Sequence, residues 1–202
     1  MSKFKKLGIL LISAIFCVMN TVPSVVYAFE VNNYYQEEQV NQISEEIDEK
    51  LSKPLDLTNS EIENLIQQKK DIYTDLSEEQ MRQIAYKVLS PYATRASVWD
   101  GQGVTLSEFA FAFDVIVGGL ISGYASLGKY AAAKGVSAAR SMMSRAAKAA
   151  AQRVGVLTGF ISKILGAAFA VINIYYNVGY ALAQFIDARD YYPNNGRINA
   201  WA

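Results

Sequence analysis

A four-residue pattern that recurs along this chain constrains its fold more than any other feature of its sequence. Ser or Thr is followed three residues later by Glu or Gln at 60–63, 77–80 and 105–108, each time close to an apolar run. In such a capping box, each of the two side chains accepts a hydrogen bond from a free backbone amide at the start of a helix. We therefore predict helices that begin at Ser60, Ser77 and Thr105.

A further helix is indicated upstream by apolar spacing alone. Val40, Ile43, Ile47 and Leu51 recur at steps of three and four residues, with acidic side chains filling the positions between them, until the pattern stops at Pro54. This spacing places the four apolar side chains on one helix face. The N-terminal part is thus predicted to contain three short, acidic, amphipathic helices, the last of them ended by Pro91.

The charges are unevenly distributed along the chain. Residues 29–100 carry 15 acidic and 7 basic side chains, whereas residues 101–202 carry 4 acidic and 9 basic ones. An asymmetry of this kind points to a polyanionic or membrane partner, or to a segment that masks a charged surface.

The second half is rich in glycine and alanine, and we expect it to be helical throughout. Its segment Lys129–Arg153 combines ten alanines with six bases and no acid, which predicts a cationic helix. Its bases spread over more than half of the helix circumference, so a sharply two-faced surface helix is not indicated. We expect these bases to bind anionic surfaces: Lys129, Lys134, Arg140, Arg145, Lys148 and Arg153.

The last apolar segment, Ile164–Ile186, has 23 residues without a charge. That length is enough for a membrane-spanning helix, but its polar residues also suit a helix packed inside a soluble bundle, and both interpretations stay open. We expect Ile172, Tyr175 and Tyr176 to contact the membrane or a target protein. Two Gly-x-x-x-Gly pairs, at 119–123 and 155–159, are compatible with close helix packing in either setting.

Composition removes the common catalytic side chains from the expected mature chain. It contains no histidine, and its single cysteine, Cys17, lies in the segment expected to be removed. Metal centres, thiol nucleophiles and imidazole bases therefore lack their usual residues, although carboxylate chemistry stays available. We predict a protein that is not an enzyme and has no catalytic residue, metal or cofactor.

The first 28 residues are typical of a secretory signal peptide. Three lysines precede an apolar run of about a dozen residues, which is shorter than the roughly 20 needed for a spanning helix, and Val26-Tyr27-Ala28 resembles a cleavage site. We expect cleavage between Ala28 and Phe29, and an extracellular protein.

The predicted organisation has four parts: a signal peptide over 1–28, an acidic helical pro-like region over 29–92, an exposed linker over 93–104 and a cationic, apolar active region over 105–202. The acidic region could hold the cationic one inactive until a protease cuts the linker near Arg95 or Val98. The alternative is a single compact domain whose halves merely differ in charge.

The chain resembles the large unmodified bacteriocins of streptococci and enterococci, the group that includes the streptococcin A type, dysgalacticin and enterocin V. The resemblance rests on the signal peptide, the acidic helical leader, the Gly/Ala-rich second half and the ending Asp190–Trp201. It implies an all-α helical bundle and an antimicrobial protein that acts on the envelope of competitor cells. The implied partners are a target membrane or envelope protein and an extracellular protease, with no nucleic acid.

The chain departs from this group in one respect. Some members depend on an internal disulfide, which the expected mature chain cannot form because it has no cysteine. The alternative function is a secreted helical binding or immunity-type protein that does not kill.

Overall fold

The computed structural model describes residues 38–92, 103–156, 158–173 and 176–199. The chain divides into two compact units, Met1–Gln42 and Ile43–Ala202. In the first unit, residues 38–42 are helical. The second unit contains every other described element and is treated by itself below.

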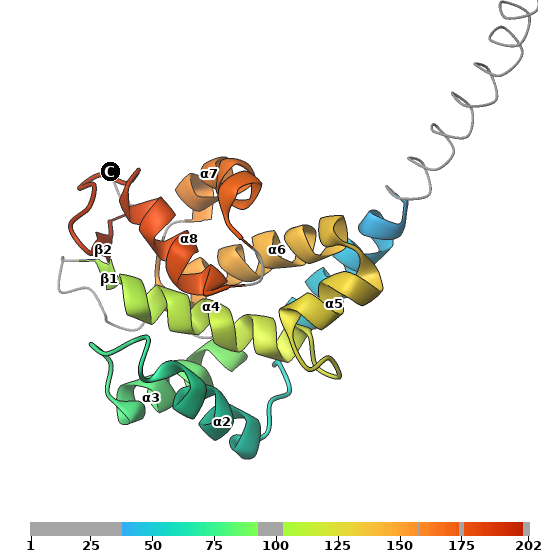
Figure 1. The fold of residues 1–202 in the computed structure, drawn as a ribbon, viewed down its shortest axis with the longest axis horizontal. Helices are drawn as coiled ribbons and strands as arrows, with labels where there is room; N and C mark the ends of the chain where they lie inside the picture. Colours follow the sequence, from blue (N-terminus) through green and yellow to red (C-terminus); the bar gives the residue numbers. More distant parts are fainter. Residues whose placement is uncertain (1–37, 93–102, 157, 174–175, 200–202) are drawn as a thin grey trace, which may run out of the picture. The chain divides into compact units, whose positions relative to one another are not determined.

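The second unit is mainly α-helical, as the sequence predicts (Figure 1). It opens with helical residues 43–51. The elements that follow are α2 (Asn59–Lys69), α3 (Glu78–Leu89), β1 (Val104–Thr105), α4 (Leu106–Leu120), α5 (Leu127–Lys134), α6 (Val136–Val154), α7 (Thr158–Val171), α8 (Val178–Asp187) and β2 (Arg197–Ile198).

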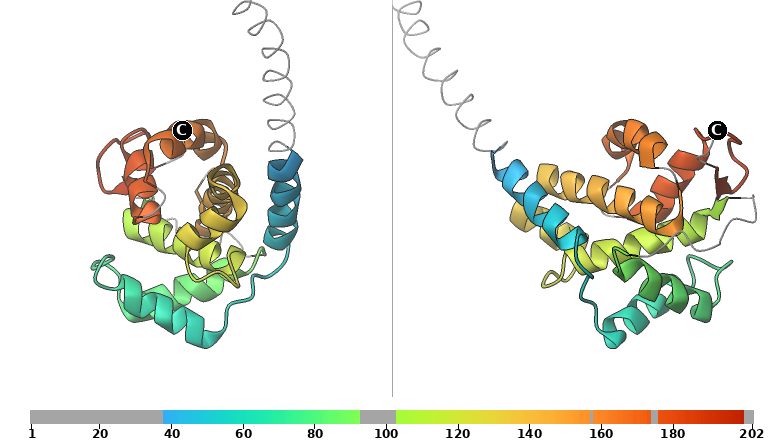
Figure 2. Two further views of the ribbon diagram at one scale, coloured as in Figure 1. Left: turned by 45° about the vertical axis from the view of Figure 1, so that its right-hand side comes forward. Right: turned by 180° about the vertical axis from the view of Figure 1, so that it is seen from behind.

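Helix α4 forms the centre of this unit. Phe111 lies on the opposite side of the helix from Phe109 and Phe113, yet all three are at most 1% exposed, so α4 is buried on both sides. Helices α3, α6 and α8 pack against it. Figures 1 and 2 show α2 and α3 on one side of α4, with α6 and α8 on the other. Burial of each phenylalanine contributes about 1.5–3 kcal/mol.

The helix starts predicted at Ser77 and Thr105 are confirmed, and both have complete capping boxes. The start predicted at Ser60 is wrong, because α2 has Thr58 as its N-cap, with Glu61 completing the box. The earlier start places Leu57 and Ile62 at the two positions that form a hydrophobic staple around a helix N-terminus. The apolar pairing therefore favours the upstream copy of the same pattern.

The single helix predicted over 129–153 is wrong. Gly135, with φ +92°, separates α5 from α6, and α6 ends at Gly155 in the left-handed conformation. Glycine adopts such angles without strain because it has no Cβ. Gly155 therefore ends a helix instead of forming a packing face with Gly159, and Gly123 likewise lies beyond the end of α4 with φ +90°.

The charge-free segment 164–186 is divided between α7 and α8, so the continuous element predicted there is wrong. Val171 is the last residue of α7, and Asn177 precedes α8 with φ +40°. Asparagine tolerates this left-handed conformation better than most residues. Within the part of the chain that the structure describes, no helix is both long and apolar enough to cross a membrane.

A two-stranded antiparallel sheet connects the end of the described chain to the start of α4. Val104 pairs with Ile198, and Thr105 pairs with Arg197. Gly103 has φ +89°, and a Cβ there would lie 2.7 Å from the carbonyl oxygen of Ile198, so only glycine fits. The prediction of an exposed linker over 93–104 is therefore wrong for residues 103 and 104, which are buried. The other residues of the predicted linker lie outside the described ones.

The segment after α8 is organised by two carboxylates. Asp187 accepts hydrogen bonds from the backbone amides of Asn195 and Gly196, and Asp190 accepts them from Tyr192 and Asn199. Burial raises the pKa of the Asp190 carboxyl. These bonds hold the turn predicted at 193–196 and position β2 for pairing with β1.

Candidate functional site

The described chain contains a run of helices that has bases and no acid. No Asp or Glu occurs between Val115 and Ile186, and this stretch includes all of α5, α6 and α7. Helix α6 packs against both α5 and α7. We refer to these three as the acid-free helices.

Most of the bases predicted to bind anionic surfaces are accessible on these helices. Lys129, Arg140 and Lys148 are exposed, and Lys134 is partly exposed. Lys163 on α7 is also exposed, although its position was not among the predicted binding residues. The acid-free helices therefore present positive charge to solvent with no acidic residue of their own to neutralise it.

Arg145 is one of the points where the acidic region contacts the acid-free helices. Its Nε atom lies 2.9 Å from Oδ1 of Asp48, and its Nη1 atom donates a hydrogen bond to Ser141. The Ser141 hydroxyl is in turn hydrogen bonded to Ser44. The helical residues 43–51 thus run beside α6, and the negative charge of Glu46 contributes to a raised pKa of Tyr130 on α5, after the larger effect of burial.

Arg153 does not face an anionic surface as predicted, because only 4% of it is exposed. Its Nη1 atom donates to the carbonyl oxygen of Val88 at 2.5 Å, and its Nη2 atom donates to that of Leu51 at 2.9 Å. Burial lowers the pKa of this guanidinium. Arg153 therefore ties α6 to the ends of two segments of the acidic region.

The residues predicted to contact a membrane or target lie where α7 gives way to α8. Ile172 is half-buried, Tyr176 is 74% exposed, and Val171 next to them is 71% exposed. Tyr175 lies outside the described residues, as do the processing positions Ala28, Phe29, Arg95 and Val98. The described part of this turn thus exposes two large apolar side chains to solvent.

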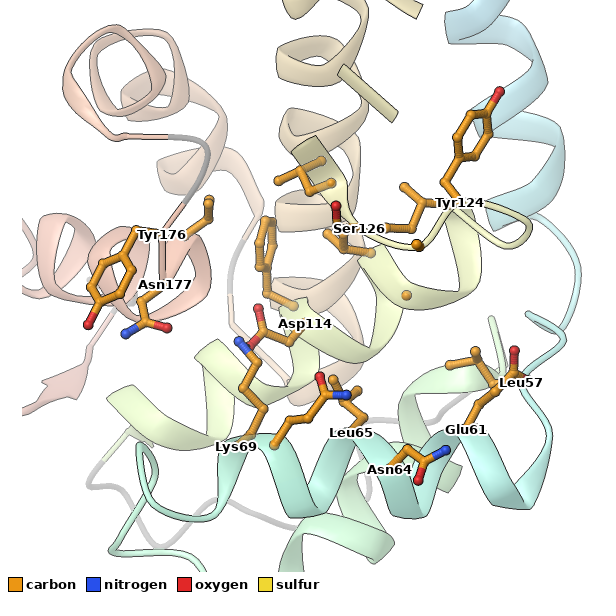
Figure 3. Close-up of a pocket in the computed structure, with 18 residues that line it drawn as sticks. Leu57, Glu61, Asn64, Leu65, Lys69, Asp114, Tyr124, Ser126, Tyr176 and Asn177 are labelled. Atoms are coloured by element: carbon orange, nitrogen blue, oxygen red, sulfur yellow. The ribbon is translucent and has the colours of Figure 1, made fainter. Parts of the chain in front are cut away.

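A groove of about 420 Å³ lies between α2, α4 and the starts of α5 and α8 (Figure 3). Leu57, Glu61 and Asn64 line one wall, and Tyr176 and Asn177 lie at one end. Its walls combine apolar side chains with amides and carboxylates, as ligand clefts commonly do.

A largely buried ion pair contributes to the wall of this groove. The Nζ atom of Lys69 lies 2.7 Å from Oδ2 of Asp114, and the Tyr73 hydroxyl donates to the same oxygen at 2.7 Å. The side chains of Lys69 and Asp114 are 19% and 11% exposed. Asp114 is the only charge in the apolar run 109–121, but nothing in the sequence identifies Lys69 and Tyr73 as its partners.

The fold and these surfaces define an all-α protein in which one acidic and one cationic region share a core. Among the described residues, no group of three or more histidine, cysteine, aspartate or glutamate side chains could hold a metal ion. The chain matches no family model, no curated protein and no solved structure with which it was compared.

Proposed function

We propose that this chain is a secreted bacteriocin that acts on the cell envelope of competitor cells. The observation that carries the proposal is the set of acid-free helices, whose exposed bases have no acid between Val115 and Ile186 to balance them. An anionic envelope attracts such a surface, with each lysine or arginine near it contributing about 1 kcal/mol.

Contacts of the acidic region support control of this activity by an intramolecular cover. Asp48 pairs with Arg145, and the backbone carbonyls of Leu51 and Val88 occupy the donors of Arg153. An extracellular protease that cuts between the acidic and cationic regions would be the first step in removing this cover.

The experiment compares growth inhibition and vesicle leakage by residues 29–202 and by two charge-neutralised variants. The first variant removes three exposed bases of the acid-free helices: Lys129→Gln, Arg140→Gln and Lys163→Gln. The matched control removes three bases of the acidic region: Lys50→Gln, Lys53→Gln and Lys70→Gln.

We expect the unmodified chain to inhibit at least one strain in a panel of Gram-positive bacteria and to bind anionic vesicles. The first variant should bind these vesicles about 100-fold more weakly, since three charges contribute about 3 kcal/mol in total. The control should change binding much less. Equal losses in the two variants, or no inhibition at micromolar concentrations, would contradict the proposal.

The groove between α2 and α4 favours a second candidate function, a secreted helical protein that binds a ligand without killing. A cleft of about 420 Å³ is within the size range of small-ligand sites. The candidate predicts that an Asn64→Ala substitution in the groove wall weakens ligand binding while neutralisation of the acid-free helices does not. The bacteriocin proposal predicts the reverse pattern for growth inhibition.

A further inference from the structure

A second cavity, of about 340 Å³, lies beside the C-terminal half of α6. One wall is a stripe on α6 that contains Arg145, Lys148 and Gln152, residues spaced three and four apart and so on one helix face. Residues from the 43–52 segment and Pro91 form the opposite side. The cavity is therefore an open cleft lined by parts of the chain that are far apart in sequence.

Positive charge dominates the lining of this cavity. Among the described residues that line it, Arg145, Lys148 and Arg153 contribute three cations and Asp48 contributes the only carboxylate. Arg153 has its terminal nitrogens bonded to two backbone carbonyls, so it supplies charge without forming the site's hydrogen bonds. Lys148 is exposed and takes part in no ion pair among the described residues. Its ammonium group is free to bind an anion.

We propose that this cavity is a binding site for a phosphate group, with Lys148 and Arg145 as its direct ligands. Guanidinium and ammonium groups bind phosphate through short, charge-assisted hydrogen bonds, and arginine adds a planar fork that fits two oxygens. The cavity volume of about 340 Å³ is large enough for a phosphate ester with a small organic group. The ligand class is thus a phosphomonoester or phosphodiester head group.

Asp48 acts as a replaceable internal anion at this site. It holds Arg145 through a single ion pair at 2.9 Å, and its own side chain is 60% exposed. Exposed pairs of this kind are weak, so an incoming phosphate takes the place of the carboxylate at small energetic expense. Binding of phosphate would therefore release one of the contacts between the acidic region and α6.

The inference rests on the proposed function only for the source of the phosphate, either an anionic lipid or a phosphate-containing wall polymer. The first arm of the test titrates residues 29–202 with glycerol 3-phosphate and with acetate by calorimetry. The second arm measures binding to phosphatidylglycerol and to phosphatidylcholine vesicles. Saturable binding of glycerol 3-phosphate, with weaker binding of acetate, supports the site. Binding to phosphatidylglycerol vesicles that Lys148→Gln weakens more than Lys129→Gln does identifies lipid as a source.

Substitutions then assign the site to its residues. Lys148→Gln should weaken glycerol 3-phosphate binding roughly tenfold or more, because it removes a charge-assisted hydrogen bond. Asp48→Asn should strengthen binding, and Lys129→Gln, a matched change of an exposed lysine elsewhere, should leave it unaltered. Lys148 and Asp48 are exposed, so neither variant threatens the fold.

The proposal is overturned if the unmodified chain shows no binding at millimolar glycerol 3-phosphate, or if Lys148→Gln binds as tightly as the unmodified chain. Growth inhibition is scored separately. Phosphate binding without inhibition would leave the site standing and refute the bacteriocin function, and inhibition without phosphate binding would do the opposite.

Discussion

Loss of the lysine in the ion pair between Lys69 and Asp114 should strongly lower the free energy of unfolding. Both side chains are largely buried, and Asp114 lies within the most enclosed helix of the fold. Lys69→Met leaves the carboxylate buried without its counter-ion, a change that lowers the free energy of unfolding by about 3–5 kcal/mol. Asp114→Asn removes the charge but keeps an oxygen that can accept the Tyr73 hydrogen bond, and Lys69 can extend toward solvent, so the loss should be near 1 kcal/mol.

The double variant Lys69→Met with Asp114→Asn separates charge pairing from packing. With neither charge present, its free energy of unfolding should lie within about 1–2 kcal/mol of the unmodified chain, well above that of Lys69→Met alone. Urea unfolding of residues 29–202, followed by far-UV circular dichroism, measures all four proteins. With a slope of roughly 2 kcal/mol per molar, Lys69→Met should lower the midpoint by about 1.5 M or more.

The reasoning fails if Lys69→Met lowers the free energy of unfolding by less than about 1 kcal/mol, because the carboxylate would then be adequately solvated without its partner. It also fails if the double variant is as unstable as the single one, since the loss would then come from packing of the lysine stem and not from charge.

Two further predictions concern two separate helix glycines and a surface ion pair. Gly179→Ala should lower the free energy of unfolding by about 1–3 kcal/mol, because the added Cβ would lie 2.7 Å from the Ala110 carbonyl oxygen. Gly166→Ala in α7 gives its Cβ no packing neighbour within 4 Å among the described residues and should raise the free energy of unfolding by about 0.5–1 kcal/mol. Urea unfolding midpoints test both changes. Arg82 holds the pKa of Glu63 below its ordinary value of 4.5, so this pair stabilises the fold above that pH and the contribution is lost as the pH falls through the lowered pKa. Glu63→Gln should therefore lower the urea midpoint at pH 7 but not at pH values well below 4, and an equal loss at both would contradict this assignment.

Local signals explain which parts of the fold could be predicted from the sequence. Capping boxes act within four residues, so the starts at Ser77 and Thr105 follow from the chain alone. The pattern alone does not locate the start of α2, because two overlapping copies of it occur there, and apolar pairing across the helix end selects Thr58. The break between α5 and α6 depends on a single glycine, Gly135, in an alanine-rich run. Helix propensity summed over the whole segment does not reveal this break, because the alanines outweigh the glycine.

Long-range contacts explain what could not be predicted about the candidate sites. Arg153 has the same sequence context as the exposed bases of α6, but its partners are backbone carbonyls 65 and 102 residues away. Backbone acceptors leave no mark in the side-chain sequence, so no pattern distinguishes Arg153 from Lys148. The cavity beside α6 is assembled from three such distant segments, and for that reason only the fold identifies it.

The shared core limits what proteolysis alone can do under the proposed function. Tyr73, Met81 and Val88 from the acidic region are fully buried in the same cluster as the apolar side chains of α4. Each contributes about 1.5–3 kcal/mol of burial that cutting the intervening chain does not remove. A cut between the two regions therefore yields two fragments that stay associated, and separation needs a competitor for their contacts. An anionic surface is such a competitor, because it offers Arg145 a replacement for Asp48 and attracts the exposed bases at the same time. Surface binding would then be the step that separates the two regions, and cleavage of the chain between them would make that separation easier.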